Sequence, residues 1–241
     1  MREQLSAQAD GAILFDAEAS SQVGARWFDA DWWRGRGALR EQSGGRGGVQ
    51  VVTTPVGACV LRHYRRGGLV ARVLGDRYLW CGADATRCFA ELRLLGVIAQ
   101  LELPGPVPVA ARYVRSGLYY RADLLTRQIP DAQTLAQCLA AGRLDAARAR
   151  AVGAVVARFH RAGIWHADLN AHNVLVTPQG VHLIDFDRSR QRAQGDGWRQ
   201  ANLQRLRRSL VKLGAAATGE AAFVAAIWQP LVAAYEAGYR A

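Results

Sequence analysis

The sequence reads HADLNAHN at residues 166–173, VLVT at 174–177 and, after the turn PQG, VHLIDFD at 181–187. Two short apolar runs around a Pro-Gln-Gly turn predict a β-hairpin. Because a hairpin returns the chain to the end where it began, we expect Asp185 to lie near Asn173. An amide oxygen and a carboxylate suit Mg²⁺, which keeps few protein ligands beside phosphate oxygens and water. The stretch therefore predicts a magnesium site at the open end of the hairpin.

The same spacing is that of a kinase catalytic loop and its metal motif, H-x-D-L-x-x-x-N followed by D-F-x. In that layout Asp168 orients the attacking hydroxyl or accepts its proton. An isolated Asp and Asn at this separation are common, whereas the joint pattern with apolar strands between its parts is hard to obtain by chance. The pattern predicts phosphoryl transfer from ATP, with Asp168 as the catalytic residue and Asn173 and Asp185 as Mg²⁺ ligands.

Other kinase parts are present in weaker form. Gly45 and Gly47 lie in an imperfect glycine-rich loop whose backbone N–H groups can cover phosphates, although a plain surface loop is the alternative. Arg62 stands where kinases carry a strand lysine, and the chain's single lysine, Lys212, lies in a late helix. We expect Arg62 to contact the nucleotide phosphates and Glu91 to be its ion-pair partner. The alternatives are a strand arginine and a helix glutamate that face solvent.

Hydrophobic periodicity and turn signals divide the chain into a strand-rich half and a helix-rich half. The expected strands are 49–54, 58–64, 109–114, 118–129, 174–177 and 181–185, and the expected helices are 84–101, 134–141, 145–162, 199–213 and 220–238. This order predicts an α+β protein with a two-lobed, kinase-like fold, an N-lobe over 1–129 and a small helical C-lobe over 130–241. The backbone of Arg127 and Ile129, in the segment that joins the lobes, is expected to hold adenine.

Charge and composition point to an anionic partner. Of 241 residues 31 are Lys or Arg and 20 are Asp or Glu, which gives a formal net charge of +11. Nucleic acid, an anionic membrane surface and a phosphorylated substrate all fit that surplus. No apolar run is long enough to cross a membrane, and no secretory signal is visible. The 4 cysteines form no C-x-x-C pair, so that neither a zinc site nor a disulfide framework is indicated and a reducing cytoplasm fits best.

Several stretches together resemble a known family. They are HADLNAHNVLV, LIDFDRSR, VLRHYRRGG, RYLW and YRADLLTRQIP. Over roughly residues 44–212 the chain is similar to the bacterial 3-deoxy-D-manno-octulosonic acid (Kdo) kinases of the lipopolysaccharide kinase family. The resemblance implies Asp168 as the catalytic aspartate, Asn173 and Asp185 as metal ligands, and ATP as donor. It also implies, as acceptor, the 4-hydroxyl of a Kdo sugar on the lipid A–linked inner core. Arg62 in place of lysine and Asp187 in place of the D-F-G glycine are departures from protein kinases.

The resemblance also implies where in the cell the enzyme acts. A lipid-linked acceptor puts the enzyme, without nucleic acid, on the cytoplasmic face of the inner membrane of a Gram-negative bacterium, as a peripheral protein. His172, Arg188 and Arg190 are candidates for contacts to the acceptor, and loop packing or a solvated turn is the alternative for each. The arginines expected at the membrane are Arg65, Arg66, Arg72 and Arg115. The sequence indicates no oligomeric state.

Rival functions are kept open at this point. Another small-molecule kinase, of the aminoglycoside or choline type, would take cationic substrates, which the net charge of +11 disfavours. A non-catalytic basic module that binds membrane or nucleic acid is disfavoured by the complete set Asp168, Asn173 and Asp185. A protein kinase would need more chain after Asp185 for an activation segment. Trp27, Trp32 and Trp33 are expected in the core, with a membrane contact as the alternative.

Overall fold

A computed structural model describes residues 1–18, 22–42, 49–65, 75–193 and 195–241. The chain forms two compact units. The first comprises Met1–Gln100 with Pro106–Gln128, and the second comprises Leu101–Gly105 with Ile129–Ala241. The first unit therefore ends one residue before the boundary expected at 129, and a short segment after the first-unit helix belongs to the second unit.

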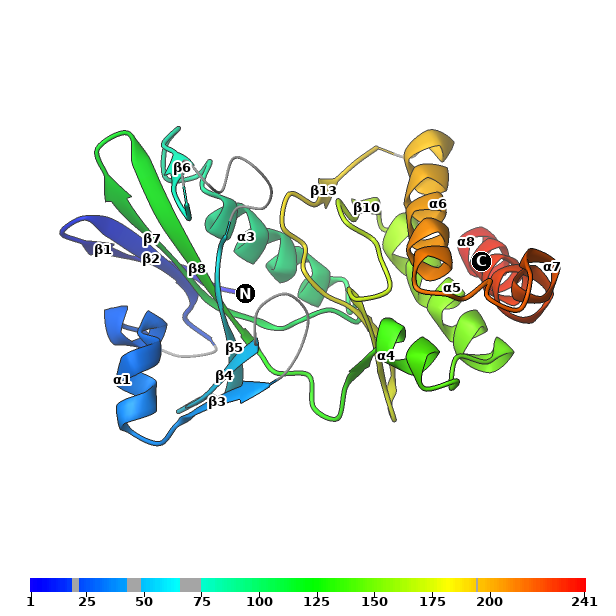
Figure 1. The fold of residues 1–241 in the computed structure, drawn as a ribbon. Coiled ribbons are helices and arrows are strands. Elements are labelled where there is room, and N and C mark those ends of the chain that lie inside the picture. The colour runs from blue at the N-terminus through cyan, green and yellow to red at the C-terminus, as the bar shows by residue number, and fades with distance from the viewer. Residues whose placement is uncertain (19–21, 43–48, 66–74, 194) are drawn as a thin grey trace. The chain divides into compact units, whose positions relative to one another are not determined.

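An antiparallel sheet forms the first unit, with strand order β1-β2-β7-β8-β5-β4-β3 and β6 paired to β8 (Figure 1). The strands are β1 Glu3–Gln8, β2 Gly11–Asp16, β3 Leu39–Gln42, β4 Val49–Thr54, β5 Gly57–His63, β6 Tyr78–Leu79, β7 Pro108–Ser116 and β8 Tyr119–Arg127. The sequence predicted β4, β5, β7 and β8 but not the N-terminal hairpin. The β1 residues are mostly exposed, so that this strand lacks the apolar alternation that marks a half-buried strand.

Helices cover both faces of this sheet. Ile13 and Phe15 of β2 pack with Trp27 and Trp33, which lie on the 3₁₀ turn η1 (Ala25–Phe28) and helix α1 (Ala30–Gly35). Trp33 Nε1 donates to the Trp27 carbonyl at 2.9 Å, and both rings are buried, so that these tryptophans belong to the core. Helix α3 (Arg87–Gln100) lies on the opposite face, where the Phe89 ring packs 5.3 Å from that of Tyr113.

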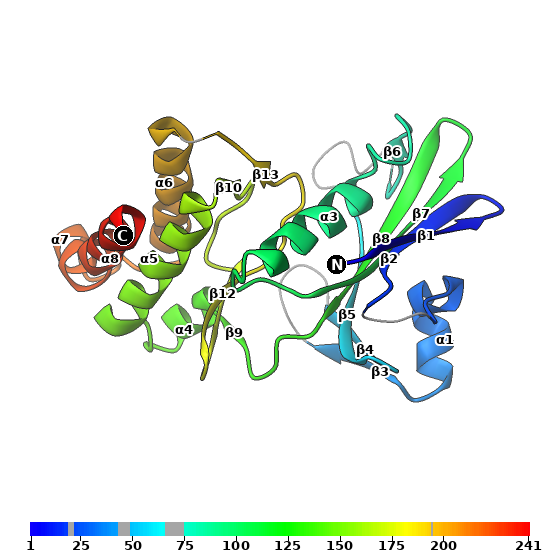
Figure 2. The ribbon, with the colours of Figure 1, turned by 180° about the vertical axis from the view of Figure 1, so that it is seen from behind.

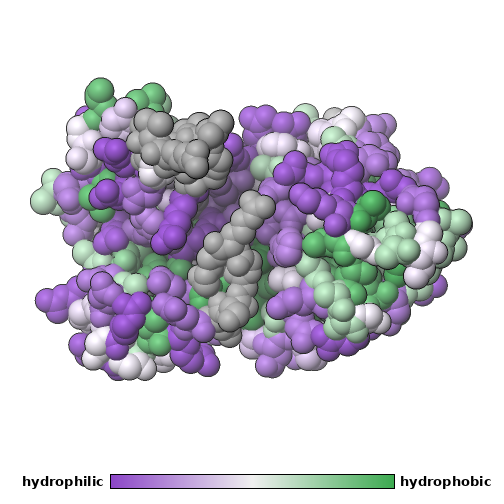
Figure 3. Space-filling model, in the orientation of Figure 1, coloured by the Kyte–Doolittle hydropathy of each residue, from purple (hydrophilic) through white to green (hydrophobic). Residues whose placement is uncertain are grey.

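Exposed apolar side chains gather at one end of the first unit. Leu79 of β6 is 59% exposed and Leu118, in the turn between β7 and β8, is 71% exposed. The two are neighbours, because the Trp80 N–H donates to the Leu118 carbonyl at 2.9 Å. Figure 3 shows hydrophobic side chains where β6 and the β7–β8 hairpin lie. We call Leu79, Trp80 and Leu118 the hairpin tip.

The second unit is mainly helical. Its helices are α4 Leu135–Ala140, α5 Ala146–Arg161, α6 Asp196–Lys212, α7 Glu220–Phe223, the π-helical turn η2 Val224–Trp228 and α8 Gln229–Arg240. Its strands are β9 Gln133–Thr134, β10 Ile164–Trp165, β11 Val174–Thr177, β12 Gly180–Leu183 and β13 Arg190–Gln191. The predicted helices at 134–141, 145–162 and 199–213 are present, whereas the single helix expected over 220–238 contains the π turn. No helix among the described residues is long and apolar enough to cross a membrane.

Helices α5 and α8 lie side by side in both views (Figures 1 and 2). Gly153 allows this approach, because a Cβ there would lie 2.0 Å from the Leu231 carbonyl oxygen. Asp145 begins α5 as its N-cap and accepts the Arg148 N–H at 2.8 Å. Helices α5 and α6 pack against the segment that carries residues 166–187.

Candidate active site

The loop 166–173 is fixed first by His166, which is 2% exposed. Its Nδ1 accepts the Asp168 backbone N–H at 3.1 Å, so that Nε2 carries the proton and donates to the Ile184 carbonyl at 3.0 Å. Burial lowers the pKa of the His166 ring, which keeps it neutral. His166 is thus a brace that joins the loop to the residue before Asp185.

Two amide side chains hold the loop's centre. Asn173 Nδ2 and Asn170 Nδ2 both donate to the Asp168 carbonyl, at 2.9 and 3.0 Å. The Asn173 carbonyl accepts the Ile184 N–H at 3.0 Å, which sets the start of β11 beside the end of β12. The hairpin predicted from the sequence therefore forms and returns the chain to Asn173.

Asp185 adopts a left-handed backbone conformation, with φ 62°. This conformation costs free energy for a residue other than glycine, and such residues cluster at functional sites. The stacked rings of Phe159 and Phe186, 5.5 Å apart, anchor the residue that follows. The buried Phe186 thus fixes the backbone while Asp185 stays partly accessible.

The residues at this point fit Mg²⁺ by their donor chemistry. The N–H₂ group of Asn173 donates to the Asp168 carbonyl, so that the amide oxygen of Asn173 is the atom left to face a cation. Asp185 adds a carboxylate at the other side of the hairpin's open end. A pair of hard oxygen ligands is what Mg²⁺ takes from proteins when phosphates supply the rest.

One face of α6 holds the loop 166–173 at three points. Asn202 Nδ2 donates to the His166 carbonyl at 2.9 Å, and Asn202 Oδ1 accepts the His166 N–H at 3.3 Å. Ser209 Oγ accepts the Ala171 N–H at 3.1 Å. Arg205, between them, reaches Asp168. Residues at i, i+3 and i+7 share one helix face, so that a single rigid helix positions the whole loop.

Arg205 forms an ion pair with the Asp168 side chain. Its Nε donates to Asp168 Oδ1 at 2.8 Å, and its Nη2 donates to the same oxygen. Burial alone would raise the pKa of the Asp168 carboxyl, but the hydrogen bonds from Arg205 and Asn170 together with the positive charge of Arg205 outweigh it and lower the pKa below its ordinary value. Sequence reasoning missed both Asn202 and Arg205. Their spacing on one helix face was the available signal.

The first unit contains the ion pair that the sequence suggested. Arg62 Nη2 bonds to Glu91 Oε2, and the Tyr64 hydroxyl bonds to the same oxygen. The Glu91 side chain is 3% exposed and the Arg62 side chain 30% exposed. The Arg62 guanidinium also lies 4.6 Å from the Tyr64 ring centroid. A contact between Arg62 and nucleotide phosphate stays a prediction.

The other expected nucleotide contacts are those of Arg127, Ile129, Gly45 and Gly47. The Arg127 N–H donates to the Val107 carbonyl at 2.9 Å, so that a contact from Arg127 to adenine would not use this group. Ile129 is the first residue of the second unit after β8 and is half-buried. Gly45 and Gly47 lie outside the described residues. Their role is untested, as is that of Ile129.

The three candidate acceptor residues lie at different places around the loop 166–173. His172 is exposed within it, and its N–H donates to Asn170 Oδ1 at 2.8 Å. Arg188 is exposed with φ 59°. Arg190 lies on β13 with its guanidinium 5.4 Å from the Trp165 ring centroid. All three remain predictions, and Arg190 already has an aromatic partner.

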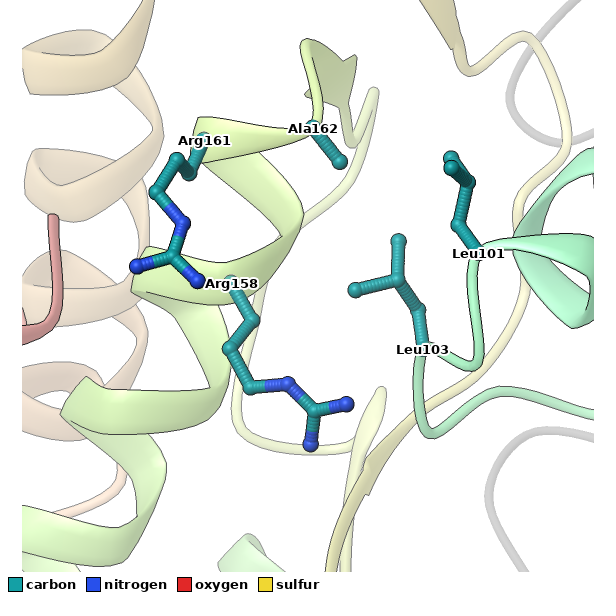
Figure 4. A pocket seen from close by; sticks show the side chains of 5 residues that line it. All are labelled: Leu101, Leu103, Arg158, Arg161 and Ala162. Carbon is teal, nitrogen blue, oxygen red and sulfur yellow. The ribbon is translucent and has the colours of Figure 1, made fainter. Parts of the chain in front are cut away.

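A separate pocket of about 260 Å³ lies beside α5. Figure 4 shows Arg158 and Arg161 of α5 on one side, with Leu101 and Leu103 on the other. Arg158 Nη2 donates to the Glu102 carbonyl at 2.7 Å. None of Asp168, Asn173 and Asp185 lines this pocket.

Comparison with known proteins places this geometry in a family. The chain is 50% identical over 205 residues to a 3-deoxy-D-manno-octulosonic acid kinase of Stenotrophomonas maltophilia (strain R551-3), which covers 84% of this chain and 81% of the relative. A relative of the same name from Xanthomonas axonopodis pv. citri (strain 306) is also 50% identical, with the same coverage. A solved structure titled WaaP in complex with acyl carrier protein superposes with a TM-score of 0.51 at 18% identity, covering 88% of this chain and 85% of the other. That likeness shows the fold.

The family assignment covers nearly the whole chain. A sequence model described as "Lipopolysaccharide kinase (Kdo/WaaP) family" matches residues 30–235, which include Arg62, Glu91 and the complete catalytic loop. The predicted two-lobed, kinase-like α+β fold is confirmed by the structure and by the WaaP likeness. The chain belongs to the lipopolysaccharide kinase (Kdo/WaaP) family.

Proposed function

We propose that this protein is an ATP-dependent kinase that phosphorylates the 4-hydroxyl of a Kdo sugar on the lipid A–linked inner core during lipopolysaccharide core biosynthesis. The observation that carries the proposal is the loop 166–173, which α6 holds in place with Asp168 half-buried, in a chain 50% identical to Kdo kinases. The fold alone would not name the acceptor. The similarity to Kdo kinases over 84% of the chain supports a Kdo-containing acceptor.

In this proposal Asp168 receives the acceptor hydroxyl. A carboxylate whose pKa is lowered is a weak base, so that Asp168 chiefly orients the hydroxyl toward the phosphorus and takes its proton late. Asn173 and Asp185 would hold Mg²⁺, which supplies positive charge for the phosphate oxygens of ATP. Arg62, held by the buried Glu91, adds a fixed cation for the nucleotide phosphates.

The alternative of a cationic acceptor is disfavoured by the charge of the site. An aminoglycoside or choline would be attracted by carboxylates, whereas here the Asp168 carboxylate is neutralised by Arg205 and the chain carries +11 overall. A phosphorylated, acidic glycolipid matches that balance.

A direct experiment separates the 4-hydroxyl from the other hydroxyls of the sugar. We would incubate the protein with Mg²⁺, ATP and Kdo–lipid A precursor, and in parallel with the 4-deoxy-Kdo form of the same glycolipid. The expected result is phosphate incorporation into the first acceptor and none into the second. Equal incorporation into both would move the reaction to another hydroxyl.

The acceptor's lipid anchor requires the enzyme to meet a membrane, and we assign that contact to the hairpin tip. Leu79 and Leu118 are exposed apolar side chains, and the half-buried Trp80 follows Leu79 with the Arg115 guanidinium 4.9 Å from its ring centroid. Exposed leucines beside a tryptophan and an arginine are typical of a surface that enters the headgroup region of an anionic bilayer. Arg66 and Arg72, expected at the membrane as well, lie outside the described residues.

Vesicle flotation tests this contact. We expect reversible binding to phosphatidylglycerol-containing vesicles that weakens as salt rises from ~0.01 M to ~1 M, because the screening length falls from ~30 Å to ~3 Å. Leu118→Asp should reduce the bound fraction, whereas Leu213→Asp, at a leucine 40% exposed in the second unit, should not. Equal binding of wild type and Leu118→Asp would contradict the hairpin tip as the contact.

A further inference from the structure

The ion pair between Arg205 and Asp168 raises a chemical question. A kinase aspartate that orients a hydroxyl works as an acceptor of a hydrogen bond, and a cation on its carboxylate weakens it in that role. Arg205 nevertheless puts both Nε and Nη2 on Oδ1 of Asp168. A residue that weakens the catalytic carboxylate is expected to contribute something else at the same place.

Arg205 lies on the helix that holds the loop, so that its backbone position is fixed together with the loop. Arg205 follows Asn202 by one helical turn of α6, and Asn202 is 3% exposed and bonded to both backbone groups of His166. The Arg205 side chain is 49% exposed, so that the guanidinium edge directed away from Asp168 faces solvent. A rigid helix thus presents an arginine fork beside the atom that receives the acceptor hydroxyl.

We infer that Arg205 is a specificity-determining residue that binds the carboxylate of the acidic sugar acceptor while Asp168 binds its hydroxyl. The inference rests on the proposed function, since it names the contact that selects an acid rather than a neutral sugar. An anionic acceptor would be repelled by a bare Asp168 carboxylate, and Arg205 makes the pair neutral. A guanidinium has five N–H donors, so that those not used on Asp168 serve a second carboxylate.

The acceptor is a better match for Arg205 than the nucleotide phosphates. In the proposed function Arg62, paired with Glu91, supplies the cation for phosphate, and Asn173 and Asp185 supply the metal ligands. Of the acceptor candidates, Arg190 is occupied by the Trp165 ring. Arg205 is the arginine that the structure places directly on the catalytic carboxylate.

The test compares Arg205→Gln, Arg205→Lys and the control Arg208→Gln, which removes an exposed arginine from the same helix. Each is assayed with Mg-ATP on Kdo–lipid A precursor and on its Kdo carboxyl methyl ester. With the free acid, Arg205→Gln should raise the acceptor KM about 10- to 100-fold, the value of a charge-assisted hydrogen-bonded pair, and leave the KM for ATP within about twofold. Arg205→Lys should restore part of the loss, and Arg208→Gln should behave as wild type.

The methyl ester decides between recognition and loop support. On the ester, Arg205→Gln should show no loss of kcat/KM relative to wild type, because the carboxylate that Arg205 binds is absent from this acceptor. Equal losses for Arg205→Gln on acid and ester would overturn the inference in favour of a positioning role through Asp168. A rise in the KM for ATP alone would overturn it in favour of phosphate contact. A wild-type enzyme that fails to phosphorylate the free acid would instead contradict the proposed function.

Discussion

Replacing Asn202 by Ala tests whether α6 positions the catalytic loop. The change removes the acceptor shared by the His166 N–H and the His160 ring, each at 3.3 Å, and the donor to the His166 carbonyl at 2.9 Å. His166 and His160 are 2% and 1% exposed, so that water cannot readily replace these bonds. A buried polar group left without its partner costs about 1–3 kcal/mol, and we take the low end for each of the three groups. The expected loss of unfolding free energy is therefore about 3 kcal/mol.

This loss has a thermal and a kinetic readout. For a chain of this size each 1 kcal/mol shifts Tm by about 2–4 °C, so that the melting temperature of Asn202→Ala should fall by about 6–12 °C. At a temperature where the variant is still folded, turnover should fall about 10²-fold, because the loop no longer holds Asp168 in place. Differential scanning calorimetry and the kinase assay measure the two effects.

A matched control on α6 is Gln204→Ala, at an exposed position two residues on. An exposed substitution of this kind changes stability by no more than about 0.5 kcal/mol. If Asn202→Ala melted and turned over like Gln204→Ala, the assignment of α6 as the support of the loop would be refuted.

Further expectations concern the other charged groups. Asp168→Ala should lower turnover about 10²- to 10⁴-fold with unchanged Tm, and near-normal turnover would mean that the loop is misassigned. Arg62→Ala should raise the KM for ATP and Arg62→Lys should restore part of it, whereas wild-type ATP kinetics in Arg62→Ala would leave that residue without a nucleotide role. His63 bonds to Asp123 at 2.7 Å and to Asp76 at 2.9 Å, and the hydrogen bond to Asp123 raises its pKa. The Tm advantage of wild type over His63→Gln should therefore be full below the unfolded-state pKa of about 6.5 and shrink as pH rises through the raised pKa, and a pH-independent advantage would contradict the charged pair.

The parts of the site that the sequence predicted are those set by local spacing. Asp168, Asn173 and Asp185 lie within one loop and one hairpin, so that the turn at 178–180 and the flanking apolar runs fix their order in space. The strands β4 and β5 were predicted for the same reason, because Pro55-Val56-Gly57 is a local turn signal between two β-rich runs.

The parts that could not be predicted depend on contacts distant in the chain. Asn202 and Arg205 bond to residues 36 and 37 positions away. Their spacing places them on one helix face, but it does not tell which distant residues that face contacts. The hairpin β1–β2 was missed because its place at the sheet edge comes from pairing with β7, about a hundred residues later in the chain. By contrast, the π turn η2 ends two residues before Pro230, which cannot donate to the carbonyl four residues earlier. The expectation of one regular helix over 220–238 did not take this proline into account.

Mass spectrometry of the glycolipid product tests the central claim most directly. Kdo–lipid A precursor is incubated with Mg-ATP and either wild type or Asp168→Asn, which keeps the size of the side chain but removes its charge. We predict that wild type adds a single phosphate to the Kdo portion and that Asp168→Asn adds little or none in the same time. A wild-type protein that leaves the glycolipid unphosphorylated while it transfers phosphate to another acceptor would contradict the account.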